Sequence, residues 1–126
     1  MTKILFVCHG NICRSPMAEF VMKDLVEKAG LADEFTIASA ATSTEEIGNP
    51  VYPPVRQLLA RHGISCAGKT ARQLQRGDYA AWDLFVGMDT ANLRNMTRLF
   101  GGDPEGKVHA LLDYTHRPGE VADPWY

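Results

Sequence analysis

The sequence of 126 residues has few cysteines, little excess of either charge and no long apolar run. Three cysteines without a Cys-x-x-Cys pair argue against a disulfide framework and favour a reducing, cytoplasmic compartment. A net charge of -2 gives no reason to expect binding to nucleic acid or to a membrane. The apolar run from Ile4 to Val7 is too short for a signal peptide or a membrane-spanning helix. These absences indicate a cytoplasmic protein in which any basic binding site is formed by a few neighbouring residues.

The sequence also lacks metal-ligand patterns and internal repeats. Three histidines have no ligand spacing with the cysteines, namely His62, His109 and His116. We therefore expect no metal and no cofactor. With 45% hydrophobic and 22% charged residues, the composition is that of an ordinary globular protein, and the length predicts one domain over residues 1–126.

Short apolar segments alternate with helix-like patterns along the chain. Strands are expected at residues 4–7, 35–40, 64–66, 84–88 and 108–112, and helices at 16–29, 54–62 and 90–100. Ser15 is the expected N-cap of the first helix, with Met17, Val21 and Leu25 as its apolar stripe, and Asp89 is the expected N-cap of the last. The alternation predicts an α/β fold in which helices cover both faces of a parallel sheet. Ligands of such sheets bind beyond the carboxyl ends of the strands.

The most informative stretch joins the first expected strand to the first helix and reads Cys-His-Gly-Asn-Ile-Cys-Arg-Ser-Pro at residues 8–16. Loop amides and a helix N-terminus favour a bound anion. Cys8 lies there as a candidate thiolate nucleophile, and the planar guanidinium of Arg14 can bind two phosphate oxygens. Asn11 suits a left-handed turn, and Ser15 can donate a hydrogen bond to the sulfur. A lone cysteine is usually a core residue, but here its combination with the arginine, the glycine and the Ser-Pro helix start favours catalysis.

Cleavage of an aryl phosphate through a thiol also needs an acid for the leaving group and a base for the attacking water. Asp123, in the segment Asp-Pro-Trp-Tyr at residues 123–126, is the best candidate. Trp125 and Tyr126 can line a groove for an aryl group. An isolated Asp-Pro pair is more often a turn, but its combination with the loop favours a catalytic acid.

These residues resemble the low-molecular-weight protein tyrosine phosphatases. The matching motifs are residues 7–19, 88–93 and 123–126, and the resemblance covers essentially the whole chain. It implies a three-layer αβα fold with a four-stranded parallel sheet and the phosphatase loop at the C-terminal end of the first strand. It also implies metal-free, two-step hydrolysis of phosphotyrosine proteins or small aryl phosphates by a monomer or weak dimer.

The resemblance also implies roles for single residues. Cys8 would be the nucleophile, Arg14 the phosphate ligand, and Asp123 the general acid and base. The phosphate-binding loop would consist of His9, Gly10, Asn11, Ile12, Cys13 and Arg14. Ser15 and Ser39 would support the loop together with Asn11. Cys13 would be the redox partner that forms a protective disulfide with Cys8 on oxidation.

The sequence departs from the family pattern at four points. Glu45 stands where many relatives have a tryptophan, which predicts a polar, acidic wall of the substrate site. Lys69 stands where a histidine often joins the supporting network, so we expect different support for Asn11. His9 stands where an apolar residue is frequent, and we expect it to bias which substrates fit. The chain ends at Tyr126, whereas relatives continue to a further helix, so we expect either a truncation or another cover for that face of the sheet.

Three other functions stay open at this point. In the arginine-phosphatase branch of the family a threonine stands at the position of Ile12, so Ile12 favours phosphotyrosine. An arsenate reductase would pass oxidation from Cys8 to further cysteines, and only Cys66 follows the loop. We expect Cys66 to be an ordinary core residue. A non-catalytic phosphoprotein-binding module is the third alternative.

Overall fold

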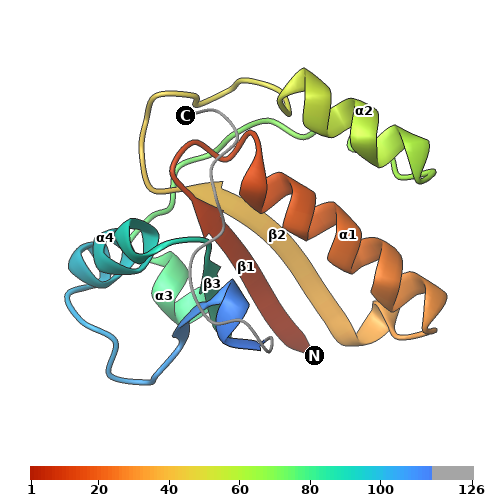
Figure 1. Cartoon of the computed structure of the whole chain (residues 1–126). Helices are drawn as coiled ribbons and strands as arrows, with labels where there is room; N and C mark the ends of the chain where they lie inside the picture. The colour runs from red at the N-terminus through yellow and green to blue at the C-terminus, as the bar shows by residue number, and fades with distance from the viewer. Residues whose placement is uncertain (115–126) are drawn as a thin grey trace.

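The computed structural model describes residues 1–114, so the predicted site residues Asp123, Trp125 and Tyr126 lie outside the described residues. Four strands form a sheet in the spatial order β2-β1-β3-β4, and every pairing is parallel (Figure 1). The strands are β1 (Thr2–Cys8), β2 (Phe35–Ala41), β3 (Leu84–Gly87) and β4 (Val108–Ala110). This confirms the expected four-stranded parallel sheet.

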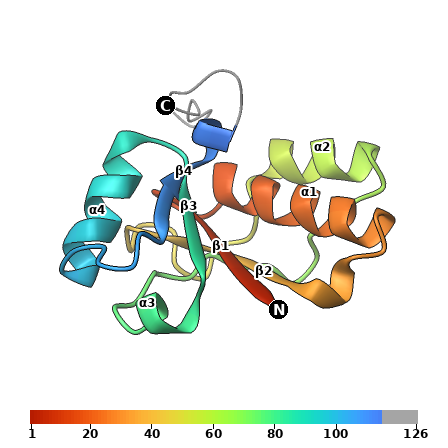
Figure 2. The ribbon, with the colours of Figure 1, turned by 90° about the horizontal axis from the view of Figure 1, so that it is seen from below.

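Helices cover both faces of the sheet. The α-helices are α1 (Arg14–Lys28), α2 (Pro53–Arg61), α3 (Asp78–Ala81) and α4 (Thr90–Phe100), and the 3-10 helices are η1 (Ala32–Glu34) and η2 (Leu111–Tyr114). Helices α1 and α2 lie on one side of the sheet, and α3 and α4 lie on the other (Figure 2). The three-layer αβα architecture is therefore confirmed. No helix among residues 1–114 is both long and apolar enough to cross a membrane.

The continuous apolar run in β1 follows from its position between these two layers. Side chains alternate along a strand, so Ile4, Phe6 and Cys8 pack in the core on the α1 side. Leu5 and Val7 pack in the core on the α4 side. A central parallel strand is covered on both faces and needs no polar alternation. The same geometry carries Cys8, the last residue of β1, to the carboxyl edge of the sheet.

Helix α1 differs from its prediction in two respects. Its N-cap is Cys13, which makes no side-chain capping bond, so the assignment of Ser15 as N-cap was wrong. The Ser15 hydroxyl instead contacts Cys8 and Asn11. The expected apolar stripe was also wrong in part, because Val21 and Leu25 are exposed. Helix α2 packs against α1 through Met17 and Phe20, whereas Val21 faces an open groove between the two helices that Leu58 also lines.

Two expected strands differ from the structure. Residues 64–66 form no strand, because they cross beneath α2 and bury Cys66 in the core between α1 and α2. Isolated bridges occur further along, where Thr70 pairs with Pro50 and Gln73 pairs with Ala41. The last strand ends at Ala110 instead of residue 112, because the chain turns directly into η2. Cys66 is a buried core residue, as expected.

One carboxylate, that of Asp103, organises the turn before β4. It accepts hydrogen bonds from the Tyr79 hydroxyl at 2.7 Å and from the N–H groups of Lys107 and Val108 at 2.8 and 3.0 Å. Burial raises the pKa of the Asp103 carboxyl, but the hydrogen bonds outweigh it and hold that pKa below its usual value. The ionised carboxylate therefore stabilises the folded state fully at pH values above the pKa that aspartate has in the unfolded chain. This stabilisation is lost as the pH falls through the lowered pKa of the folded state.

An Asp103→Asn variant should therefore lose stability in a pH-dependent manner. We expect its free energy of unfolding at neutral pH to fall by about 1 kcal/mol, a modest value because the carboxylate is partly exposed. The difference from the wild type should shrink as the pH falls through the lowered pKa of Asp103, because the carboxylate is then protonated. Urea unfolding at neutral pH and along an acid series measures this. A difference that is unchanged at low pH would contradict the assignment.

Candidate active site

The loop between β1 and α1 surrounds the sulfur of Cys8. Asn11 has φ of 61°, the left-handed conformation that the sequence predicted. Its backbone N–H donates a hydrogen bond to the Cys8 Sγ at 3.3 Å. The Ser15 Oγ, in the first turn of α1, lies 3.0 Å from the same sulfur. The thiol therefore sits at a helix N-terminus with two hydrogen-bonding groups directed at it, a setting that favours negative charge.

Arg14, the first residue of α1, is held beside this loop by a carboxylate. Its Nη1 donates to the Asp89 Oδ2 at 2.8 Å, and its side chain is only 5% exposed. Asp89 is itself the N-cap of α4, as predicted, and forms a reciprocal capping box with Asn92. Asp89 thus caps the N-terminus of α4 and also holds the guanidinium group of Arg14 in place.

The approach of α4 to the sheet depends on Gly87, the last residue of β3. A Cβ atom at this position would lie 2.9 Å from the Leu93 Cδ2 and 3.2 Å from the Asn92 Cβ. A larger residue would displace the Leu93 side chain and crowd Asn92, so glycine favours the close approach of the N-terminal turn of α4. The close approach brings Asp89 to the carboxyl edge of β3, next to the end of β1.

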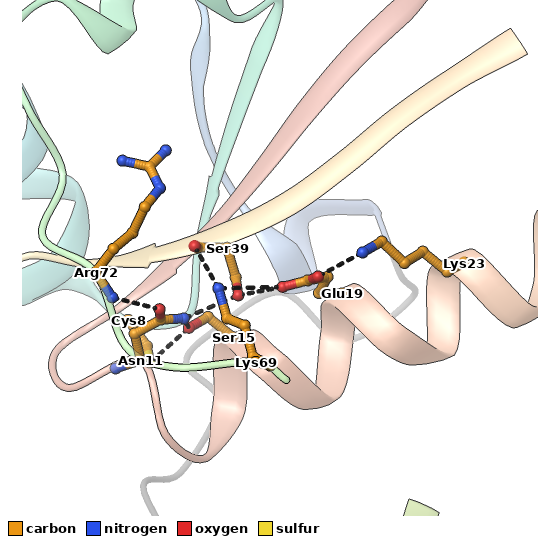
Figure 3. Close-up of polar contacts among 8 residues, drawn as sticks. All are labelled: Cys8, Asn11, Ser15, Glu19, Lys23, Ser39, Lys69 and Arg72. Atoms are coloured by element: carbon orange, nitrogen blue, oxygen red, sulfur yellow. Dashed lines mark hydrogen bonds and ion pairs between the residues drawn. The ribbon is translucent and has the colours of Figure 1, made fainter. Parts of the chain in front are cut away.

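Beneath the loop, side chains from three segments form a connected network (Figure 3). The Asn11 Nδ2 donates to the Ser15 Oγ at 2.8 Å and to the Ser39 Oγ at 2.9 Å. The Asn11 Oδ1 accepts from the backbone N–H of Arg72 at 3.2 Å. Ser39 lies on β2, which pairs directly with β1. Asn11 therefore joins the two serines that were expected to support the loop with it.

Two predicted substrate walls, His9 and Glu45, meet at the outer side of the loop. The His9 Nε2 lies 3.0 Å from the Glu45 Oε2, and both side chains are exposed. Backbone bonds from Thr42 N–H to the Cys8 carbonyl and from Ser43 N–H to the His9 carbonyl, both 3.0 Å, tie the segment of Glu45 to the loop. Glu45 therefore lies beside the loop, and its role as an acidic wall of the substrate site stays a prediction. The other two predicted walls lie outside the described residues.

The remaining loop residues occupy different environments. The side chains of Ile12 and Cys13 are buried in the core between α1 and α2, together with Cys66. Gly10 lies against the segment that carries Glu45 and Glu46, where a Cβ atom would stand 3.3 Å from the Glu46 Cγ. All three cysteines are free thiols. Within residues 1–114, no group of three or more histidine, cysteine or acidic side chains is arranged to hold a metal ion.

Sequence reasoning missed three contributions to this site. Asp89 was predicted only as a helix cap, although its position after the strand adjacent to β1 was a signal that it would reach the same sheet edge. Glu19 received no role, yet its buried carboxylate accepts a hydrogen bond from the Ser39 Oγ at 2.5 Å. The backbone N–H of Arg72 orients the Asn11 amide, and no sequence signal marks a backbone contact between residues so far apart.

Comparison with known proteins agrees with this geometry. The chain matches the family described as low molecular weight phosphotyrosine protein phosphatase over residues 3–126. The low molecular weight protein-tyrosine-phosphatase YfkJ of Bacillus subtilis is 38% identical over 128 residues, spanning 100% of this chain and 82% of that protein. The human low molecular weight phosphotyrosine protein phosphatase is 44% identical over 126 residues, spanning 98% of this chain and 79% of the human one.

Solved structures give the same result. The crystal structure of YfkJ has a TM-score of 0.96, with 100% of this chain and 80% of that chain covered. A Drosophila arginine phosphatase has a TM-score of 0.82 at 33% identity, with 93% of this chain and 74% of that chain covered. The family match over nearly the whole chain and the identity to its members show that this chain belongs to the low molecular weight protein tyrosine phosphatase family.

Proposed function

We propose that this chain hydrolyses phosphotyrosine monoesters through a phosphocysteine intermediate on Cys8. Arg14 binds the phosphate, and Asp123 acts first as general acid and then as general base. The observation that supports this most is the position of the Cys8 sulfur at the N-terminus of α1, with Arg14 held close by through Asp89. A nucleophile and a bidentate phosphate ligand then act at one anion site.

In the first step, the Cys8 thiolate attacks phosphorus and the bond from phosphorus to the phenolic oxygen breaks. The departing phenolate takes a proton from the Asp123 carboxyl group. The Arg14 guanidinium and the loop amides of residues 9–14 bind the three equatorial oxygens, where charge accumulates in the transition state.

In the second step, water attacks phosphorus and the sulfur leaves as a thiolate. The Asp123 carboxylate accepts the proton of this water and returns to its acid form, and inorganic phosphate is released. Ser15 donates a hydrogen bond to the departing sulfur, which is consistent with its Oγ lying 3.0 Å from the Cys8 Sγ. The cycle needs no metal and leaves the enzyme in its starting state.

The proposal is tested with a phosphotyrosyl peptide in the presence of a chelator. Phosphate release should persist under these conditions, and acid quenching during turnover should trap one phosphate on the peptide that contains Cys8. Absence of turnover, or phosphate trapped on another residue, would reject the mechanism.

Phosphoarginine is the alternative substrate, because a Drosophila arginine phosphatase is among the structurally similar proteins. A phosphoarginine peptide of the same sequence, measured on the same preparation, separates the two branches. We expect higher kcat/KM for the phosphotyrosyl peptide. The reverse order would assign the chain to the arginine branch.

An Asp123→Asn variant should lose more activity on substrates whose leaving group must be protonated. General acid catalysis contributes about 10²- to 10⁴-fold, so we expect kcat/KM for phenyl phosphate to fall by about 10²-fold. The loss should be much smaller for an ester of a phenol that leaves readily without protonation, such as p-nitrophenol. A series of aryl phosphates compared between variant and wild type measures this dependence. Equal losses across the series would indicate that Asp123 is not the acid.

A further inference from the structure

Lys69 is a buried lysine outside the loop that binds phosphate. Its side chain is 13% exposed, and its Nζ donates to the Ser39 backbone carbonyl at 3.0 Å and lies 3.5 Å from the Glu19 Oε1 (Figure 3). Burial lowers the pKa of Lys69, while the Glu19 carboxylate opposes that change. Burying an ammonium group is costly unless it is paired, so this contact is unlike a solvated surface ion pair.

Glu19 is the partner of this lysine and is more deeply buried, with a side chain that is 4% exposed. Its carboxylate also contacts Lys23, whose Nζ lies 2.6 Å from the Oε2 but whose side chain is 44% exposed. An ionised carboxylate only accepts hydrogen bonds, whereas a protonated one also donates. The Glu19 Oε1 accepts the hydrogen of the Ser39 hydroxyl, and the Lys69 Nζ lies near this same oxygen, whereas Lys23 contacts the Oε2.

The hydrogen-bond directions can be followed from Glu19 to the Ser15 hydroxyl. Since the Ser39 hydroxyl donates to Glu19, its oxygen is free to accept from the Asn11 Nδ2. The Arg72 N–H occupies the Asn11 Oδ1, which fixes the amide so that both of its hydrogens point toward the two serines. The Ser15 oxygen accepts one of them, which leaves the hydrogen of the Ser15 hydroxyl available to the Cys8 Sγ, 3.0 Å away.

We propose that Lys69 is a positioning residue that, through its contacts with the Glu19 carboxylate and the Ser39 carbonyl, maintains the direction of the Ser39, Asn11 and Ser15 hydrogen bonds that end at the Cys8 sulfur. This inference rests on the proposed function. Lys69 touches neither substrate nor sulfur. Its effect is carried by the buried contacts between Glu19 and Ser15, with every intermediate hydrogen bond between 2.5 and 2.9 Å.

The step that depends most on this direction is the second one. When water attacks the phosphocysteine, the sulfur leaves with a negative charge, which the Ser15 hydroxyl stabilises by donating to it. Loss of the Lys69 charge should therefore slow hydrolysis of the phosphoenzyme more than its formation. Formation needs phosphate binding and a good leaving group, and the contacts of Arg14 with Asp89 do not involve Lys69.

The experiment is rapid-quench hydrolysis of p-nitrophenyl phosphate by the full chain and four variants. Lys69→Met removes the charge and the hydrogen bonds, Lys69→Gln removes the charge but retains a donor, and Lys69→Arg retains the charge. Lys23→Met is the matched control, because it removes the more exposed cation from the same carboxylate. Thermal unfolding of each variant reports the folded fraction separately.

For the two neutral Lys69 variants we expect steady-state kcat to fall by about tenfold, equivalent to one hydrogen bond to a charged group. The first turnover should stay within about threefold of the wild-type rate, so nitrophenolate appears in a burst of one equivalent per folded site. Lys69→Arg should recover most of the wild-type kcat, and Lys23→Met should change it by less than about threefold. A purely structural defect would reduce the burst amplitude and the steady state together.

Equal rates for wild type and both neutral variants, with no change in the burst, would overturn the role of Lys69 and leave the proposed function intact. An equal loss in Lys23→Met would also overturn it, because the solvated cation would then suffice. If Lys69→Met does not fold, Lys69→Gln gives the same comparison. A wild-type chain that does not hydrolyse the ester would instead reject the proposed function.

Discussion

A Cys8→Ser variant is expected to lose at least about 10⁴-fold in aryl phosphate hydrolysis, the size of effect seen when a catalytic nucleophile is removed. The thiol lies where the N-terminus of α1, the Asn11 N–H and the Ser15 hydroxyl all favour a negative charge. A serine hydroxyl ionises far less readily than a thiol, and this site contains no described histidine in contact with Cys8 that could act as its base. The same surroundings that suit a thiolate therefore leave a serine inert.

Steady-state turnover in chelator measures this loss, and binding of inorganic phosphate provides the control on the site. Phosphate should bind the variant about as tightly as the wild type, because Arg14 and its contact with Asp89 are unchanged. Cys66→Ser makes the same substitution at another buried cysteine, one in the core between α1 and α2. This control should retain activity in its folded fraction. Turnover by Cys8→Ser within about tenfold of the wild type would reject Cys8 as nucleophile.

Much of the fold and the centre of the site could be predicted from the sequence because both depend on local patterns. An apolar run followed by a glycine-containing loop and a Ser-Pro start predicted β1, the loop and α1 to within about two residues at each end. Asn11 was predicted to be left-handed because few other residues adopt that conformation readily, and its φ is 61°. These features are encoded within about ten residues of one another.

Contacts between distant segments were harder to predict. Glu19 and Lys69 are charged residues that would ordinarily be exposed, and their burial depends on the position of β2 and of the segment after α2. The contact of Asp89 with Arg14 depends on Gly87, which admits α4 close to the end of β3. The error in the α1 stripe has the same origin, because periodicity predicts an apolar face but not how closely α2 packs against it.

The contact between Asp89 and Arg14 predicts the second large effect, in an Arg14→Lys variant. Lysine keeps the positive charge, but it cannot present two parallel N–H groups to a phosphate while a third donor contacts a carboxylate. Arg14 is 5% exposed and its Nη1 is already directed at Asp89 by the 2.8 Å bond, so the guanidinium is held in place before the substrate binds. We expect kcat/KM for aryl phosphates to fall by about 10³-fold, or about 4 kcal/mol of transition-state stabilisation.

Three comparisons distinguish this role from general loss of charge or stability. Arg56→Lys makes the same change on the exposed surface of α2 and should leave kcat/KM unchanged. Asp89→Asn should reduce kcat/KM less than Arg14→Lys, since the guanidinium remains but is oriented less firmly. In the double variant the losses should not add, because a lysine at position 14 no longer needs the carboxylate to align a planar group. Additive losses would mean that Asp89 affects activity only by capping α4. If the kcat/KM of Arg14→Lys stayed within about fivefold of the wild-type value, a point charge at position 14 would be sufficient.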